Sequence, residues 1–271
     1  MSTLTLDELA THIPSGCLLA VPPDYSGVAM AATRALIQHK PQGLRVLCVP
    51  VGSIQVDQLI GAGMVDSVEA AAVTLGEFGL APRFIAAVQN GSLIVKDTTC
   101  PAVHAMLQAT EKGVPFMPLR GLLGTDILAH RDDWKVLNNP FAERPDPLVL
   151  LPAVQPDVAL FHAPMADSEG NVWIGRRREL VTMAHAAKTT LVTVERIVEG
   201  CFFDDEQLAA GVLPGLYVSH IALAPRGAWP LGLGDEYAPD AEHLAAYARL
   251  ARSDDGFADY LARYVLTPVE A

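Results

Sequence analysis

The chain has 271 residues, of which 51% are hydrophobic and only 6% aromatic, and 19 basic against 31 acidic side chains give it a formal net charge of −12. This length and composition fit one large α/β domain with an aliphatic core. The acidic balance favours a soluble protein and argues against a nucleic-acid partner, because phosphate backbones are repelled at long range. There is no basic-then-apolar leader and no run of roughly 20 apolar residues, so we expect a cytoplasmic protein without a membrane partner.

Short apolar strands alternate with amphipathic helices along the chain. The expected strands cover residues 17–21, 45–50, 67–73, 92–96, 114–117, 148–151, 158–162, 171–174, 190–195 and 217–224. The expected helices cover residues 26–39, with Ser26 as its cap, then 56–62, 81–89, 101–112 and 179–187. A tail at about 240–265 is expected to form two helices, split near Ser253. This alternation predicts right-handed crossovers and an open, mostly parallel sheet flanked by helices.

The chain shows no boundary between domains. Residues 124–147 are polar and rich in proline, and we interpret them as a surface excursion of a single domain that covers residues 1–271. Cys17, Cys48, Cys100 and Cys201 have no metal-ligand spacing, and the eight histidines are dispersed. We therefore expect reduced, buried cysteines and no metal site.

A rigid loop follows the first expected strand. Its sequence, Pro-Pro-Asp-Tyr-Ser-Gly over residues 22–27, leads into a helix whose N-terminus offers free N–H groups and positive partial charge. Asp24, Tyr25, Ser26 and Gly27 are therefore candidates for binding a thioester oxygen or an anion. The alternative is an ordinary loop stiffened by two prolines.

Two further loops carry candidate residues. Arg120 has a charge suited to a carboxylate or phosphate, and Gly121 lets backbone N–H groups approach the ligand, although a turn with a surface arginine is an equal alternative. In residues 157–171 an apolar strand runs into a polar turn with His162 and Asn171, where a hairpin turn and a core histidine are the alternatives. Since ligands bind at the carboxyl ends of strands in such sheets, we expect these two loops and residues 22–27 to converge on one pocket.

These segments, taken in order, resemble the alpha-type subunits of class I CoA-transferases, and the glutaconate CoA-transferase branch in particular. Residues 157–171 are similar to the family's strand that ends in a His-Ala…Ala-Asp…Gly-Asn turn, and residues 122–126 to its Gly-Thr-Asp loop. Other similar segments are residues 59–65, 194–199, 214–215 and 224–230. The resemblance covers roughly residues 15–230 and implies the CoA-transferase, or NagB/RpiA-like, fold.

The resemblance implies an enzyme of two related subunits. A glutamate of the beta-type partner attacks the acyl-CoA, forms an acyl anhydride and then a glutamyl-CoA thioester, and passes CoA to a carboxylic acid. Coenzyme A then enters as the acyl-CoA substrate. This chain supplies part of the acyl pocket and no catalytic residue. The basic run at residues 176–178 could meet the phosphates of CoA or an acidic partner surface, or be a solvated helix start.

The chain departs from the family pattern in two places. The family's Gly-Gly-Phe after the first strand is Pro22-Pro23-Asp24 here, which removes two N–H donors. Relatives that open rings of CoA-linked intermediates by hydrolysis carry a glutamate just before the helix at Pro101, where this chain has Thr98-Thr99-Cys100. Two alternatives therefore stand beside the transferase: part of a hydrolase or lyase of the same fold that acts on a CoA thioester, and a non-catalytic binding subunit.

Overall fold

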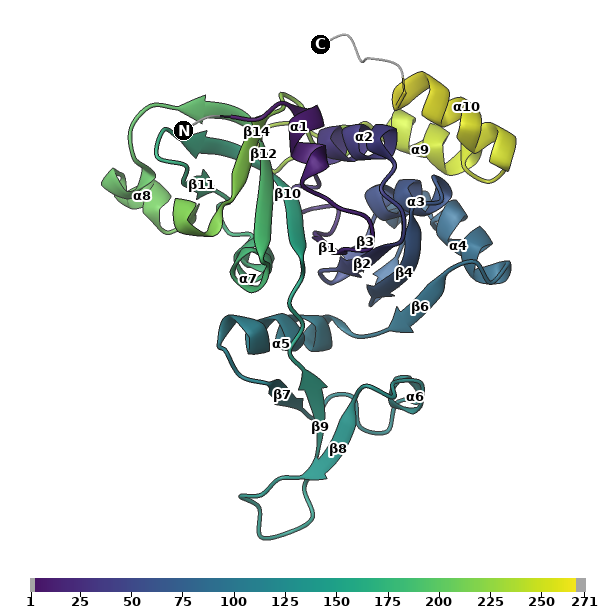
Figure 1. The fold of residues 1–271 in the computed structure, drawn as a ribbon, viewed down its shortest axis with the longest axis vertical. Coiled ribbons are helices and arrows are strands. Elements are labelled where there is room, and N and C mark those ends of the chain that lie inside the picture. The colour runs from purple at the N-terminus through teal and green to yellow at the C-terminus, as the bar shows by residue number, and fades with distance from the viewer. Residues whose placement is uncertain (1–2, 267–271) are drawn as a thin grey trace.

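The computed structural model describes residues 3–266 and has a nine-stranded sheet at its centre (Figure 1). Seven of these strands are parallel, and the register of each neighbouring pair confirms the expected mostly parallel sheet. Across the sheet they lie in the order β14 (His220–Leu223), β12 (Thr189–Val198), β10 (Val158–Asp167), β1 (Leu18–Val21), β2 (Leu44–Cys48), β4 (Val65–Ala70) and β6 (Ile94–Asp97). The short strands β11 (Val172–Trp173) and β13 (Val212–Leu213) extend the far end of β10 in the antiparallel sense.

Helices cover both faces of this sheet, as a buried parallel sheet requires. Successive residues of β1 point to opposite faces, so Leu19 and Val21 belong to one hydrophobic cluster and Ala20 to the other. The helices of the first cluster are α1 (Leu6–Thr11), α2 (Met30–His39), α3 (Ile54–Gly61), α4 (Pro82–Gln89), α9 (Ala241–Leu250) and α10 (Asp254–Tyr264). Those of the second are α5 (Cys100–Glu111) and α7 (Arg178–Ala186).

The first two helices of the chain differ from expectation. Helix α1 was not predicted, although Thr5 and Glu8 form a capping box whose Thr-x-x-Glu spacing is visible in the sequence. Helix α2 begins at Met30, and the predicted cap at Ser26 is wrong. The Ser26 hydroxyl donates to the Glu179 carboxylate instead, and Gly27 has φ +79°, so residues 26–29 form a loop.

Residues 116–152 form a smaller sheet that projects from the body (Figure 1). Strand β9 (Pro147–Pro152) pairs antiparallel with β7 (Phe116–Leu119) on one side and with β8 (Lys135–Asn138) on the other. Residues 124–147, interpreted as a surface excursion, are not devoid of regular structure, since they contain β8 and the short helix α6 (Asp126–Ala129). Strand β8 was not predicted because the prolines that follow it suggested a loop.

A buried arginine attaches this projection to the main sheet. Arg131 reaches Glu69, near the end of β4, at 2.8 Å and binds Asp133 at 2.8 Å. Its guanidinium also donates to the Asp97 carbonyl at 3.0 Å and lies 4.0 Å from the centre of the Trp134 ring. A buried arginine held this way satisfies most of its donors, so the contact links the two sheets firmly.

The C-terminal tail forms two helices as predicted, and the Ser253 hydroxyl caps α10 by accepting from Gly256 N. Cys17 and Cys48 are buried, but Cys100 is exposed and Cys201 partly exposed, so the expectation of four buried cysteines is wrong. No helix within residues 3–266 has the length and apolar character needed to cross a bilayer. The assignment of residues 1–271 to one domain stays a prediction, and residues 1–2 and 267–271 lie outside the described range.

Candidate functional site

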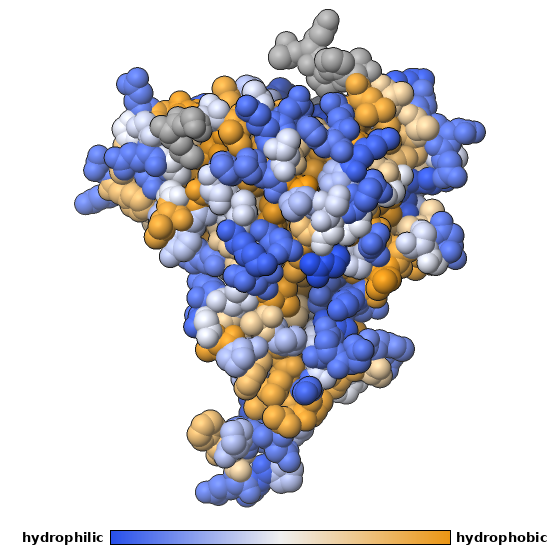
Figure 2. All heavy atoms as spheres, viewed as in Figure 1, coloured by the Kyte–Doolittle hydropathy of each residue, from blue (hydrophilic) through white to orange (hydrophobic). Residues whose placement is uncertain are grey.

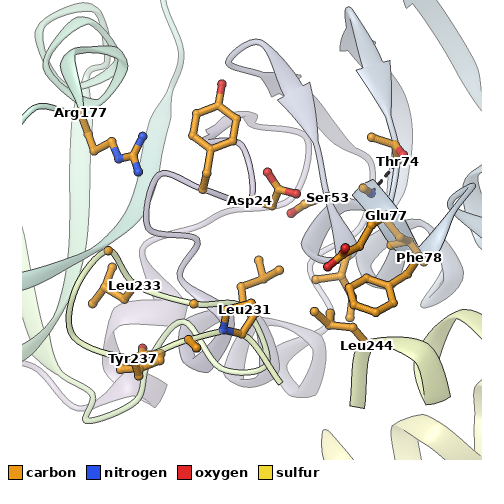
Figure 3. Close-up of a pocket in the computed structure, with 18 residues that line it drawn as sticks. Asp24, Ser53, Thr74, Glu77, Phe78, Arg177, Leu231, Leu233, Tyr237 and Leu244 are labelled. Carbon is orange, nitrogen blue, oxygen red and sulfur yellow. Dashed lines mark hydrogen bonds between the residues drawn. The ribbon is translucent and has the colours of Figure 1, made fainter. Parts of the chain in front are cut away.

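A cavity of about 640 Å³ opens at the carboxyl ends of three neighbouring parallel strands (Figure 3). Residues 24–25 follow β1, residues 53–54 follow β2, and residues 74–78 follow β4; all three segments line the cavity. Residues 231–234 and 237–239, with Leu244 of α9, close the other side. Because open parallel sheets bind ligands at the carboxyl ends of their strands, this cavity is the candidate site.

The cavity combines an apolar lining with a smaller set of polar side chains, which includes three charged residues and the buried Ser53. Its large apolar residues are Ile54, Leu75, Phe78, Leu231, Leu233 and Leu244. In Figure 3, Asp24 and Ser53 point toward one another, Glu77 lies beyond Ser53, and Arg177 stands on the opposite side. The site therefore offers carboxylates and a hydroxyl at one end and a single cation at the other.

Ser53 is the most unusual of these groups. It is only 3% exposed and stands directly before α3, yet its side chain does not cap that helix. Among residues 3–266 its hydroxyl has no hydrogen-bond partner, and the carboxylates of Asp24 and Glu77 form neither a hydrogen bond nor an ion pair. An unpaired buried hydroxyl costs about 1–3 kcal/mol, so a ligand that bonds to Ser53 would recover this free energy.

Tyr25 and Arg177 form one edge of the cavity. The Arg177 guanidinium lies over the Tyr25 ring, 5.3 Å from its centre. Burial raises the pKa of the Tyr25 hydroxyl, and the nearby carboxylates of Glu179 and Asp24 raise it further. Of the basic run at residues 176–178, only Arg177 lines the cavity in the described part of the chain.

Ser26 and Gly27 hold the loop in place and do not line the cavity. The Gly27 carbonyl accepts from the His162 N–H at 2.7 Å, which ties the loop to β10. A Cβ at Gly27 would lie 2.0 Å from the His162 carbonyl oxygen, and φ is +79°. Glycine is therefore required here, both for the close approach and for the positive φ.

His162 belongs to a buried network behind the cavity. Its ring is fully buried, with its nitrogens 2.8 Å from the Thr193 hydroxyl and 2.7 Å from the Glu195 carboxylate. Glu195 also accepts from the hydroxyl of Tyr237, a cavity residue, at 2.7 Å, and from Arg226 N at 2.6 Å. This geometry supports the interpretation of His162 as a satisfied core histidine.

Hydrogen bonds lower the pKa of the Glu195 carboxyl. Burial raises the pKa of its carboxyl, but the hydrogen bonds from His162, Tyr237 and Arg226 outweigh burial and hold the pKa below its ordinary value. The residue was not singled out from the sequence, although it lies in the segment 194–199 that carries part of the family resemblance. The sequence offered one signal for Glu195, because a glutamate stands there at the end of a run of apolar strand residues.

The remaining candidates serve structural contacts. The Asn171 amide donates to Asp167 at 2.8 Å, and its oxygen accepts from Gly215 N at 2.9 Å, which fixes the turn after β10. Arg120 makes two hydrogen bonds to Asp146, at 3.1 and 2.6 Å, within the small sheet, and neither Arg120 nor Gly121 lines the cavity.

The expected convergence of three loops must be corrected on this geometry. Of the eight predicted site residues, Asp24 and Tyr25 alone line the cavity within residues 3–266. The loop 22–27 meets β10 at His162, but the segment with Arg120 belongs to the antiparallel sheet that leaves the body. The prediction failed because it treated β7 as another strand of the parallel sheet.

Comparison with known proteins gives the family. The family model described as Coenzyme A transferase matches residues 3–224. The fold is similar to that of glutaconate coenzyme A-transferase from Acidaminococcus fermentans, with a TM-score of 0.89 and 24% identity, covering 98% of this chain and 89% of that one.

Among relatives by sequence, the chain is 28% identical to the A-type subunit of glutaconate CoA-transferase from Acidaminococcus fermentans, over 77% of this chain and 70% of that protein. It is 27% identical to the cholesterol ring-cleaving hydrolase IpdA subunit of Rhodococcus jostii, over 97% and 91%. An uncharacterized protein of Archaeoglobus fulgidus is 32% identical over 77% of this chain, which spans only 46% of that longer protein. The chain therefore belongs to the coenzyme A transferase family and resembles its A-type, or alpha-type, subunits.

Proposed function

We propose that this chain is the alpha subunit of a heteromeric CoA-transferase, which moves CoA between an acyl-CoA and a carboxylic acid through a glutamyl-CoA intermediate on a beta-type partner. The observation that carries the proposal is the cavity at the carboxyl ends of β1, β2 and β4, in a chain of this family. The cavity is large enough for an acyl group and is lined mainly by apolar side chains.

The cavity lacks a carboxylate prepared for nucleophilic attack. Such a carboxylate needs a desolvated site and oriented donors for the oxyanion that forms on the substrate. Glu77 is exposed, and Pro22 and Pro23 have no N–H to offer at the loop before Asp24. The nucleophile is therefore expected on the partner, and this chain supplies part of the acyl pocket.

The projecting sheet offers a surface for that partner. Large apolar side chains are exposed on it, up to 94% for Phe141, and Figure 2 shows apolar residues gathered toward that end of the molecule. The exposed residues on the sheet are Phe116, Val136, Leu137 and Phe141, and Val114 is exposed just before it. Several exposed apolar side chains on one part of the molecule are typical of a subunit interface, and a stable interface buries more than about 1,000 Å².

Co-expression with a beta-type partner tests the proposal. A panel of acyl-CoA donors and acid acceptors should give a new acyl-CoA, detected by chromatography, only with the two-subunit complex. Turnover by the purified chain alone, with partner excluded by mass spectrometry, would contradict it. Leu137→Asp should reduce co-purification of the partner, whereas Leu216→Asp, at another exposed leucine outside the small sheet, should not.

A second candidate is a hydrolase or lyase of the same fold, in which this chain is one subunit and the substrate is a CoA thioester. The relative from Rhodococcus jostii favours it, because that protein is named a ring-cleaving hydrolase subunit, with similarity over 97% of this chain. Against it stands Thr98-Thr99-Cys100, with Cys100 exposed as the first residue of α5, where such relatives carry a glutamate. Release of free CoA by the complex without any acceptor acid would select this candidate.

A further inference from the structure

We propose that the Ser53 end of the cavity is a subsite for a neutral group that both accepts and donates hydrogen bonds, a hydroxyl or a secondary amide, and that it excludes a second carboxylate on the acyl group. The inference rests on the proposed function, because it names the substrate class of the same cavity. It is independent of which group on the partner performs the chemistry.

The donors of this subsite are Ser53 and the start of α3. Ser53 is only 3% exposed, lines the cavity and has no partner among residues 3–266. Helix α3 has eight residues and begins at Ile54, itself a lining residue, so the N–H groups of its first turn lack carbonyl partners within the helix. These groups can donate to an oxygen atom of the ligand.

The acceptors are the carboxylates of Asp24 and Glu77. Both line the cavity and neither has a hydrogen bond or ion pair in the described structure. Asp24 points toward Ser53 (Figure 3), so a group that accepts from Ser53 is placed to donate to Asp24. A hydroxyl or an amide meets both demands, whereas a ligand carboxylate only accepts.

Charge at this end disfavours an anionic ligand group. Within the described chain the charged side chains that line the cavity are Asp24, Glu77 and Arg177, and two of them are negative. Arg177 stands on the side opposite Ser53 and lies over Tyr25 (Figure 3). A carboxylate at Ser53 would meet like charges without a nearby cation, so we expect it to be repelled.

The apolar lining around these groups fits a short aliphatic chain on either side of the polar group. Two parts of an acyl-CoA carry this chemistry: a hydroxylated acyl group, and the pantetheine arm with its two secondary amides. Matched substrates can distinguish them. The probes are 3-hydroxybutyryl-CoA, butyryl-CoA and succinyl-CoA, which share a four-carbon acyl chain, and free CoA.

Ser53→Ala and Ser219→Ala form the matched pair of variants. Ser219 accepts from the buried Thr190 N–H at 3.0 Å and does not line the cavity. Ser53→Ala should leave the melting temperature of the chain unchanged or raised, because it removes an unpaired hydroxyl, while Ser219→Ala should lower it. In the assembled complex, Ser53→Ala should weaken binding of 3-hydroxybutyryl-CoA about tenfold, and Ser219→Ala should not.

The pattern over the probes identifies the ligand group. A loss confined to 3-hydroxybutyryl-CoA supports a hydroxylated acyl group, and an equal loss for all four probes supports the pantetheine amide. Asp24→Asn should improve binding of succinyl-CoA about tenfold relative to butyryl-CoA. An unchanged affinity for every probe in Ser53→Ala, or a wild-type preference for succinyl-CoA, overturns the inference.

Binding and turnover are measured separately on the same complex. Titration calorimetry reports the preference among the probes, and product analysis reports transfer to an acid acceptor. If the complex transfers CoA but does not show the predicted order of affinity among the probes, the Ser53 subsite is contradicted and the proposed function stands. The predicted preference without any acyl-CoA turnover supports the subsite and removes the proposed function.

Discussion

The cavity and the network behind it both contain carboxylates and hydroxyls, but they differ in whether these groups have hydrogen-bond partners. In the network, Glu195 accepts from His162, Tyr237 and two backbone N–H groups, of Arg226 and Gly227. In the cavity, Ser53, Asp24 and Glu77 have no such partners within residues 3–266. A satisfied network stabilises the fold, whereas unpaired groups in a hollow are left for a ligand.

The largest effect is expected where the two regions meet, at Gly27. Gly27→Ala should lower the free energy of unfolding by about 4 kcal/mol or abolish folding, because the new Cβ would overlap the His162 carbonyl oxygen and φ is positive. Chemical denaturation measures the change. Gly124→Ala is the matched control, with φ +77° and nothing within 4 Å, and should lose only about 1–2 kcal/mol. Equal losses in the two variants would show that the contact with β10 is unimportant.

The next effect tests whether the network is structural. Glu195→Ala leaves His162, Tyr237 and the N–H groups of Arg226 and Gly227 without their acceptor, and should lower the free energy of unfolding by about 3 kcal/mol. Glu199→Ala, at an exposed residue on the same segment, should change stability by less than about 0.5 kcal/mol. If the Glu195→Ala protein is as stable as the wild type but its complex is inactive, Glu195 takes part in the reaction and does not stabilise the fold.

Much of the fold follows from local pattern. The alternation that sends Leu19 and Val21 to one face and Ala20 to the other is present in the sequence, and strands of this kind between helices predicted the parallel sheet. The donors around Glu195 come from residues 31 and more positions away, so local pattern does not contain them. Ser53 was missed because a helix was predicted only from residue 56, which hid its place at a helix start.

The buried carboxylate of Asp57 sharpens the contrast with Glu195. Asp57 on α3 accepts from Phe84 N at 2.8 Å and from the Tyr247 hydroxyl at 2.6 Å, which tie α3 to α4 and α9. Burial raises the pKa of Asp57 to about 6, and these two hydrogen bonds only partly oppose it. With fewer donors than Glu195, Asp57 is therefore shifted in the opposite direction.

The raised pKa has a defined consequence for stability. Between about pH 4 and 6 the folded state binds a proton that the unfolded state has released, so the free energy of unfolding falls as pH rises through this window and is level above it. Two pKa units correspond to about 3 kcal/mol at most. Asp57→Asn cannot titrate, so the wild type should lose about 2 kcal/mol relative to this variant from pH 4 to 7 in denaturant titrations. A difference that does not change with pH would contradict the raised pKa.

The smallest effect is expected at Arg120, in the projecting sheet. Its ion pair with Asp146 is exposed, with 62% of the Arg120 side chain accessible, so Arg120→Ala should leave the free energy of unfolding almost unchanged. Because Arg120 does not line the cavity, the variant complex should show equal changes in KM for a dicarboxylic and a neutral acyl-CoA. A rise in KM confined to the dicarboxylic substrate would restore Arg120 as a carboxylate-binding residue. Since Arg120 does not line this chain's own cavity, that result would mean that the substrate also contacts the small sheet in the complex, and that part of the binding site lies on the projection.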